Sequence, residues 1–117
     1  MTVLVVDDVA VFREAASEIV HKTPGFELIA VASSGAEAIR MADQLAPDLV
    51  LMDVRMEGID GSEAARIITA TRPETVVVLM SAAWTRSTPP PTVDSAIRIA
   101  KEELTSATLA ALWRSRT

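Results

Sequence analysis

The chain has 117 residues, of which 50% are apolar and 23% are charged, and its formal net charge is −5. This length and composition indicate one globular domain with a single core rather than a disordered segment. The chain has no cysteine, which excludes disulfide scaffolds, thiolate zinc sites and thiol catalysis, and its single histidine, His21, excludes sites built from several histidines. The acidic balance argues against nucleic acid and anionic membrane surfaces as partners.

No apolar run approaches the roughly 20 residues that a membrane-spanning helix needs. The first residues lead directly into a strand-like run without a basic leader, which indicates that there is no signal peptide. We therefore expect a cytoplasmic protein.

Apolar runs and helical spacings alternate through the first half of the chain. A β-branched run at 3–6 predicts a buried strand, and apolar residues that recur over 9–20 predict a helix. A second strand is expected over 27–32. A helix over 35–45 follows, and Ser34 begins the capping-box pattern at its start.

The alternation continues in the second half. An apolar run at 49–52 predicts a third strand, and Asp60 fits the cap of a helix over 62–71. The most β-branched run, at 75–80, predicts a fourth strand.

The stretch after the fourth strand is irregular. Three consecutive prolines at 89–91 forbid a helix interior, so we expect the helix after this strand to be short, displaced or missing. A short fifth strand is expected over 96–100, and Thr105 fits the cap of a last helix. Repeated strand–helix order predicts an open five-stranded parallel sheet with helices on both faces.

Polar side chains stand at the ends of four predicted strands. Asp7 and Asp8 follow the first predicted strand, and Asp53 follows the third. Ser81 follows the fourth strand, and Lys101 follows the fifth. Ligands of open α/β sheets bind at the carboxyl ends of the strands, so these groups are expected to converge. Three carboxylates at one edge repel one another unless a hard divalent cation lies among them, and Mg²⁺ suits such oxygen ligands. A carboxylate can also attack a phosphoryl group, with a metal, an ammonium and a hydroxyl positioning its oxygens.

Five pieces of the sequence share a family pattern: VLVVDD at 3–8, DLVLMDVRM at 48–56, DG at 60–61, VVLMSA at 77–82, and a lysine after the fifth strand. Together they resemble a bacterial response-regulator receiver domain. The resemblance covers the whole chain and rests on the order and spacing of the pieces. It implies a flavodoxin-like, doubly wound fold and a single, stand-alone receiver domain over 1–117 without an output domain.

The resemblance also implies roles for the acidic residues. Asp53 would accept a phosphoryl group from a histidine kinase or phosphotransfer protein of a two-component pathway. Asp7 and Asp8 would bind Mg²⁺ together with Asp53, and the backbone carbonyl of Arg55 would complete the metal site.

In the phosphorylated state, the Ser81 hydroxyl would hydrogen-bond a phosphoryl oxygen and Lys101 would pair with the phosphoryl group. Such a receiver catalyses only its own phosphorylation and dephosphorylation and is not an enzyme acting on other substrates. Its output would pass to an unknown downstream protein, with no nucleic acid or membrane partner. We expect the segment 82–95 to move, and Trp84 to be a candidate for covering the site.

Three positions depart from the family pattern. Glu57 and Glu102 stand where prolines are usual, and Arg98 stands where many receivers carry an aromatic switch residue. Glu57, Arg98 and the proline run at 89–91 motivate an alternative, a pseudo-receiver that acts as a constitutive protein-interaction module with a degraded phosphorylation switch. A phosphohydrolase with an Asp nucleophile is a third reading, weakened because Arg55 cannot serve as its general acid or base.

Simpler roles also remain open for single residues. The Asp7–Asp8 pair could be a helix cap with a solvated carboxylate, and Ser81 could merely satisfy backbone groups. Lys101 could be an ordinary surface lysine. The case for a site rests on their occurrence together at the strand ends.

Overall fold

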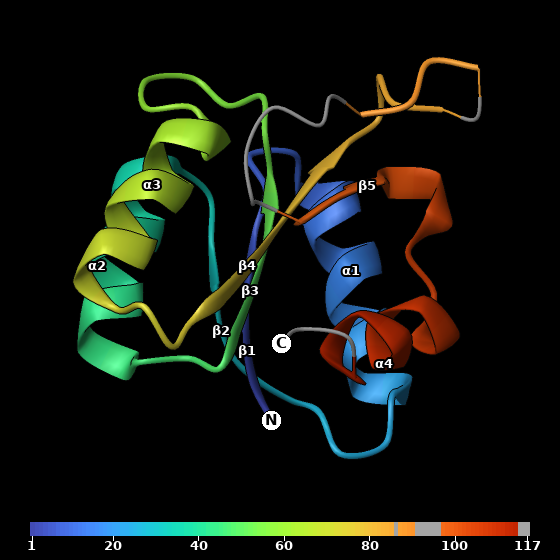
Figure 1. Cartoon of the computed structure of the whole chain (residues 1–117), viewed down its shortest axis with the longest axis horizontal. Coiled ribbons are helices and arrows are strands. Elements are labelled where there is room, and N and C mark those ends of the chain that lie inside the picture. Colours follow the sequence, from blue (N-terminus) through green and yellow to red (C-terminus); the bar gives the residue numbers. More distant parts are fainter. Residues whose placement is uncertain (86, 91–96, 115–117) are drawn as a thin grey trace.

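The computed structural model describes residues 1–85, 87–90 and 97–114. Its strands lie side by side in the order β2-β1-β3-β4-β5, and all neighbouring pairs are parallel (Figure 1). The strands are β1 (Thr2–Val6), β2 (Glu27–Ala32), β3 (Leu49–Asp53), β4 (Val76–Ser81) and β5 (Ile97–Ala100). The helices are α1 (Ala10–Lys22), α2 (Gly35–Leu45), α3 (Gly61–Thr71), the short 3₁₀ helix η1 (Lys101–Glu103) and α4 (Ser106–Arg114).

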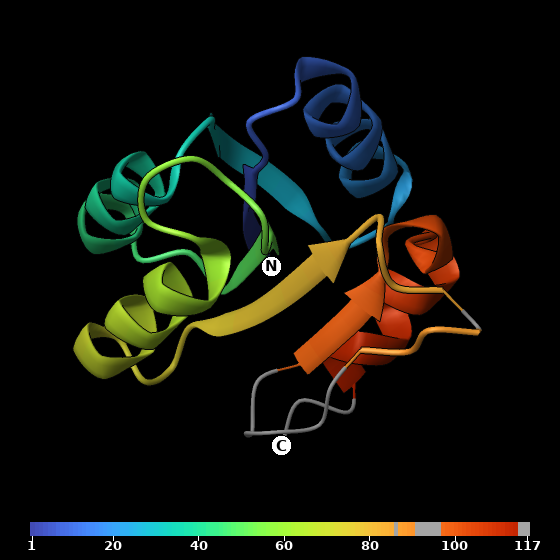
Figure 2. The same cartoon turned by 90° about the horizontal axis from the view of Figure 1, so that it is seen from above.

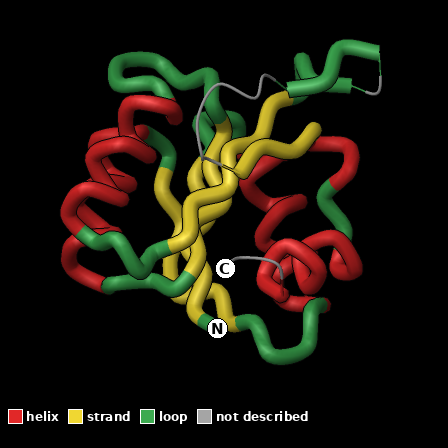
Figure 3. The backbone as a smooth tube through the Cα atoms, viewed as in Figure 1, coloured by secondary structure: helices red, strands yellow, loops and turns green. Residues whose placement is uncertain are grey.

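Helices cover both faces of the sheet, with α2 and α3 on one side and α1 and α4 on the other (Figures 2 and 3). Successive strand residues point to opposite faces. Leu4 and Val6 of β1 therefore pack in the core under α2 and α3, whereas Val3 and Val5 pack in the core under α1 and α4. A strand buried on both faces reads as a continuous apolar run, which is what the sequence has at 3–6.

The predicted flavodoxin-like sheet and the bounds of its elements are confirmed to within two residues wherever the structure describes them. The capping pattern before α2 also forms. Ser34 Oγ accepts a hydrogen bond from the Glu37 backbone N–H at 3.1 Å, and Glu37 Oε1 accepts one from the Ser33 N–H at 2.8 Å. Local sequence signals thus set the start of this helix.

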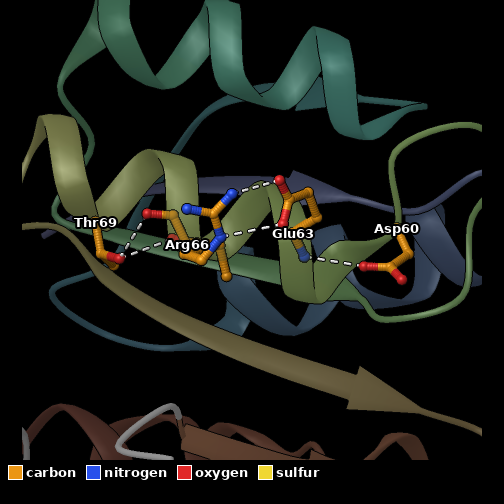
Figure 4. Close-up of polar contacts among 5 residues, drawn as sticks. Asp60, Glu63, Arg66 and Thr69 are labelled. Atoms are coloured by element: carbon orange, nitrogen blue, oxygen red, sulfur yellow. Dashed lines mark hydrogen bonds and ion pairs between the residues drawn. The ribbon is translucent and has the colours of Figure 1, made fainter.

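Helix α3 begins in a comparable way (Figure 4). Asp60 Oδ1 accepts a hydrogen bond from the Glu63 N–H at 2.9 Å, and the Glu63 carboxylate receives Arg66 Nε at 3.1 Å one turn later. Thr69 Oγ1 donates to the Ala65 carbonyl at 2.8 Å. These contacts fix the helix directly after the loop that leaves β3.

The connection from β4 to β5 departs from the alternating pattern. Residues 82–85 and 87–90 contain no helix, and Thr85 and Thr88 bond each other within a turn. The rest of this connection, including Pro91 and the predicted strand start at residue 96, lies outside the described residues. Within the described part, the expected helix between the last two strands is therefore missing, while β5 still pairs with β4.

Among the described residues, no helix is long and apolar enough to cross a membrane.

Gly61, the first residue of α3, packs directly against the backbone at the end of β3. A Cβ atom there would meet the Asp53 carbonyl oxygen and would lie 2.7 Å from Val54 Cα. Neither atom belongs to a flexible side chain, so the loop would have to shift. Gly61 N–H also donates to the Val54 carbonyl at 2.8 Å, which ties the start of α3 to this point.

We predict that Gly61→Ala lowers the free energy of unfolding by about 1–3 kcal/mol, the usual cost of overpacking. Urea denaturation followed by circular dichroism measures this change. Gly25→Ala is the matched control: its φ is +85° but open space surrounds its Cβ position, so only backbone strain of roughly 1–2 kcal/mol applies. Unchanged stability of Gly61→Ala would contradict the close approach.

Candidate functional site

Three carboxylates from two neighbouring strands gather at the carboxyl edge of the sheet, toward the top of Figure 1. Asp7 and Asp8 follow β1, and Asp53 ends β3. One carboxylate oxygen from each lies within 4.8 Å of the others. Asp7 and Asp53 are buried, at 1% and 6% exposure, whereas Asp8 is exposed. The cluster is thus recessed and open to solvent on the Asp8 side.

Asp7 is held in place by the start of α1. Its Oδ1 accepts the Val9 N–H at 3.0 Å, and its backbone carbonyl accepts a hydrogen bond from the Arg13 guanidinium at 2.7 Å. Asp7 N–H donates to the Ala32 carbonyl at the end of β2. The Arg13 contact could not be predicted from the sequence, because helical spacing places Arg13 only among the polar residues of α1.

Lys101, directly after β5, places a positive charge beside the buried carboxylates of Asp7 and Asp53. Its Nζ lies 2.6 Å from Asp7 Oδ2 and 3.7 Å from Asp53 Oδ2. Its side chain is only 13% exposed, so it is not an ordinary surface lysine. An ammonium contacting two buried carboxylates partly offsets their mutual repulsion.

Burial raises the pKa of the Asp53 carboxyl above its ordinary value, and the charges of Asp7 and Asp8 raise it further. The ammonium of Lys101 and a hydrogen bond from the Arg55 backbone N–H act in the opposite direction. The net effect is a raised pKa, so the folded protein bears a free-energy cost for ionising Asp53 in the absence of a cation.

Ser81 ends β4 beside this cluster and is buried, at 2% exposure. Its Oγ accepts the Ala83 N–H at 3.1 Å, and its carbonyl accepts the Trp84 N–H at 3.4 Å. In this conformation the hydroxyl oxygen therefore stabilises the turn after β4.

A hollow of about 720 Å³ adjoins the exposed side of the cluster. Asp8 and the exposed Arg55 line one part of it, while Trp84 and Arg98 line another. Trp84 is half-buried and packs against the core under α2 and α3. The indole predicted to lie near the site thus forms one wall of the approach to Asp8, and Arg98 lies along the same approach.

Phe12 is a neighbour of the site that helical spacing assigned to the apolar face of α1. The residue is 43% exposed, and its ring centroid lies 4.2 Å from Lys101 Nζ. Ala16 and Val20, further along the same helix, are buried as the spacing predicts. The apolar stripe therefore reaches the core only over the later turns of α1, and no sequence signal distinguishes these turns from the first.

The donor set suits a hard cation. Three carboxylates whose oxygens lie within 4.8 Å of one another match the oxygen ligands of Mg²⁺ or Ca²⁺, and the exposed Asp8 leaves room for bound waters. The cluster is the one group of three or more potential metal ligands found among the described residues.

Residues 3–97 match the family profile of the response regulator receiver domain. The chain belongs to this family. The receiver domain is 44% identical over 79 residues to a protein-glutamate methylesterase/protein-glutamine glutaminase of Shewanella frigidimarina, covering 68% of this chain and 20% of that protein. It is 43% identical over 82 residues to the corresponding protein of Syntrophus aciditrophicus, covering 70% and 23% of the two chains. The receiver domain thus spans about a fifth to a quarter of the length of these relatives.

Solved structures of receiver domains have the same fold as this chain. The receiver domain superposes on the signal receiver domain of NarL from Mycobacterium tuberculosis with a TM-score of 0.81 and 25% identity, over 98% of this chain and 95% of that one. For the response regulator domain of Thermotoga maritima CheB the TM-score is 0.75 at 25% identity, over 99% and 92%. The chain is therefore a receiver domain of the two-component systems, as the sequence resemblance implied.

The raised pKa of Asp53 gives a pH-dependent stability. Because ionisation costs the folded state free energy, this contribution to stability is intact below the ordinary Asp value of 3.8 and is lost as pH rises through the higher folded-state pKa. We predict that Asp53→Asn raises the thermal midpoint at pH 7 without divalent cations, and that the gain disappears as the pH falls below 3.8.

Differential scanning calorimetry across this pH range provides the test. Asp43→Asn, which alters a largely exposed carboxylate near the end of α2, is the control and should not raise the midpoint. An Asp53→Asn protein less stable than wild type at pH 7 would show that Lys101 outweighs burial.

Proposed function

We propose that this receiver domain accepts a phosphoryl group on Asp53 from a phosphohistidine of a kinase or phosphotransfer protein. The observation that carries the proposal is the placement of Lys101 Nζ 2.6 Å from Asp7 and 3.7 Å from Asp53 beside three clustered carboxylates. Lysine side chains are rarely buried unless they are paired. The burial of Lys101 beside these carboxylates therefore supports a role for its charge at this site. The receiver would work in the cytoplasm and pass its signal to a downstream protein by direct contact.

In the proposed step, an oxygen of the ionised Asp53 carboxylate attacks the phosphorus atom. The P–N bond to the donor imidazole breaks, an acyl phosphate forms on Asp53, and the imidazole takes a proton from solvent. A divalent cation such as Mg²⁺, bound by Asp7, Asp8, Asp53 and the Arg55 carbonyl, would supply positive charge to the phosphoryl oxygens.

The remaining groups act on the added charge of the phosphoryl group. Lys101 needs only a small shift from Asp7 toward Asp53 to pair with a phosphoryl oxygen. Ser81, whose Oγ accepts the Ala83 N–H, would turn its hydroxyl hydrogen toward the phosphoryl group and donate to it. Reorientation of the hydroxyl would loosen the turn that carries Trp84, and this turn is the described part of the segment 82–95 that we propose to move.

We assign the receiver no turnover of outside substrates, only its own phosphorylation and dephosphorylation. The similarity to the methylesterases covers 20% and 23% of their length, so their activity carries no argument about this chain. The pseudo-receiver alternative becomes the outcome if the phosphorylation test fails.

Intact-mass measurement after incubation with acetyl phosphate and Mg²⁺ tests the phosphoacceptor. We expect the wild type to gain one phosphoryl group and Asp53→Asn to gain none, since the amide is no nucleophile. Asp43→Asn should gain one as the wild type does. Absence of a gain in the wild type, both with acetyl phosphate and with a phosphorylated histidine kinase, would contradict the proposal and favour a pseudo-receiver.

Lys101→Ala should slow phosphoryl uptake by about tenfold or more, because a charge-assisted hydrogen bond contributes roughly 1.5–3 kcal/mol. The initial rate of mass gain at fixed acetyl phosphate measures this effect. Lys22→Arg, an exposed change on α1, is the control. An unchanged rate in Lys101→Ala would remove the ammonium from the proposed step.

Metal binding can be measured apart from phosphorylation. Adding Mg²⁺ should raise the thermal midpoint of the wild type by mass action, and Asp8→Asn should abolish most of the rise. Asp8 is the exposed member of the cluster, so its replacement is the least disruptive to folding. An equal rise in Asp8→Asn would place the cation elsewhere.

A further inference from the structure

Lys101 has an aromatic neighbour as well as its two carboxylates. Its Nζ lies 4.2 Å from the ring centroid of Phe12, well within the range of about 6 Å for a cation–π contact. The ammonium is therefore contacted by Asp7 from β1, Asp53 from β3 and Phe12 from α1.

Core packing does not account for the position of Phe12. Phe12 is 43% exposed as a residue, although phenylalanine is one of the most apolar residue types. A hollow of about 60 Å³ lies between α1, the end of β4 and η1, and Phe12 and Lys101 both line it. Its other walls are made by Asp7 and by five apolar residues, Ala15, Ala16, Ile19, Met80 and Leu104. The lysine stem thus runs through apolar surroundings before its ammonium reaches the acidic cluster.

The backbone at Lys101 does not by itself fix the position of the side chain. Lys101 begins the three-residue helix η1, closed by a bond from the Leu104 N–H to the Lys101 carbonyl at 3.2 Å. A lysine side chain loses roughly 1.5–2 kcal/mol of conformational entropy when it is fixed. Holding this ammonium in place therefore depends on its side-chain neighbours.

An aromatic ring is well suited to this position. A further carboxylate would add negative charge to a cluster that already contains three such groups. The face of a ring attracts the ammonium without carrying net charge, and it does not compete with the phosphoryl group for a metal. The ring also excludes water from one side of the ammonium, which strengthens its attraction to nearby oxygens.

We propose that Phe12 is a positioning residue for Lys101, whose ammonium it holds at the edge of the acidic cluster within reach of a phosphoryl group on Asp53. The ring contact persists while the ammonium shifts its main partner from Asp7 to the phosphoryl oxygens. The effect on phosphorylation rests on the proposed function, whereas the restraint of Lys101 does not.

The chain allows a direct measurement of this restraint. It contains two lysines, Lys22 and Lys101, so Lys22→Arg leaves Lys101 as the sole lysine. Lys22 is exposed and faces Glu18, a pairing that arginine preserves. In this background, ¹³C-lysine labelling gives a single set of ε-methylene NMR signals. We expect ring-current shifts in these proton signals that Phe12→Leu removes and Phe12→Trp retains.

Phosphoryl uptake from acetyl phosphate provides the second readout. Phe12→Leu keeps apolar bulk but removes the ring, and we expect its initial rate to fall by about two- to fivefold, the fold-change of a partly exposed cation–π contact. Phe12→Trp should restore the rate. In a Lys101→Ala background, Phe12→Leu should have no further effect, because the two residues then no longer act together. Val11→Ala, an exposed change on the same turn, is the control.

Each outcome decides a separate point. Identical ε-methylene shifts in the Lys22→Arg protein with and without Phe12→Leu would overturn the restraint. A normal uptake rate in Phe12→Leu, or the same loss with and without Lys101, would overturn its role in phosphorylation. If the wild type takes up no phosphoryl group, the proposed function fails, and the NMR signals still decide whether Phe12 holds Lys101.

Discussion

Repulsion among three carboxylates is the constraint on which the organisation of this receiver domain depends. In a parallel sheet all strands end at the same edge, so acidic residues at strand ends are brought together by the topology itself. Two of the three, Asp7 and Asp53, are buried there. The structure limits the repulsion with the Lys101 ammonium and leaves Asp8 in contact with solvent. An added cation would offset the repulsion that remains among the three carboxylates.

The balancing groups come from opposite ends of the chain. Asp7 follows the first strand and Lys101 follows the last, while β3 and β4 lie between them in the sheet. The ion pair can therefore form only when β1, β3, β4 and β5 are assembled side by side. The hydrogen bond from Arg13 to the Asp7 carbonyl and the ring of Phe12 add α1 to the same assembly. The arrangement of the site therefore depends on the packing of α1 as well as on the assembly of these strands.

Most of the fold could be predicted from the sequence, and so could the meeting of Asp7, Asp8, Asp53 and Lys101 at one edge of the sheet. β-branched runs and caps such as Ser34 with Glu37 are local signals, and parallel topology places all strand ends at one edge. The contacts between side chains within the site could not be predicted in the same way. Periodicity assigned Phe12 to a helix face but could not predict its exposure, because only the later turns of α1, with Ala16 and Val20, are buried against the core. The acceptor role of Ser81 toward the Ala83 N–H depends on a turn whose conformation no local pattern specifies. The segment after that turn is rich in proline, which excludes a helix without selecting one alternative.

The position of β5 links the chemistry of the site to local opening of the sheet. This strand has four residues, forms an edge of the sheet and leads directly into Lys101. Short edge strands open at a lower free energy than the centre of a sheet. A phosphoryl group bonded to Asp53 and paired with Lys101 would join β3 to β5 across β4. Amide protection in this edge strand would then report the lifetime of the acyl phosphate, so the least stable part of the sheet is also the part best placed to register the signal.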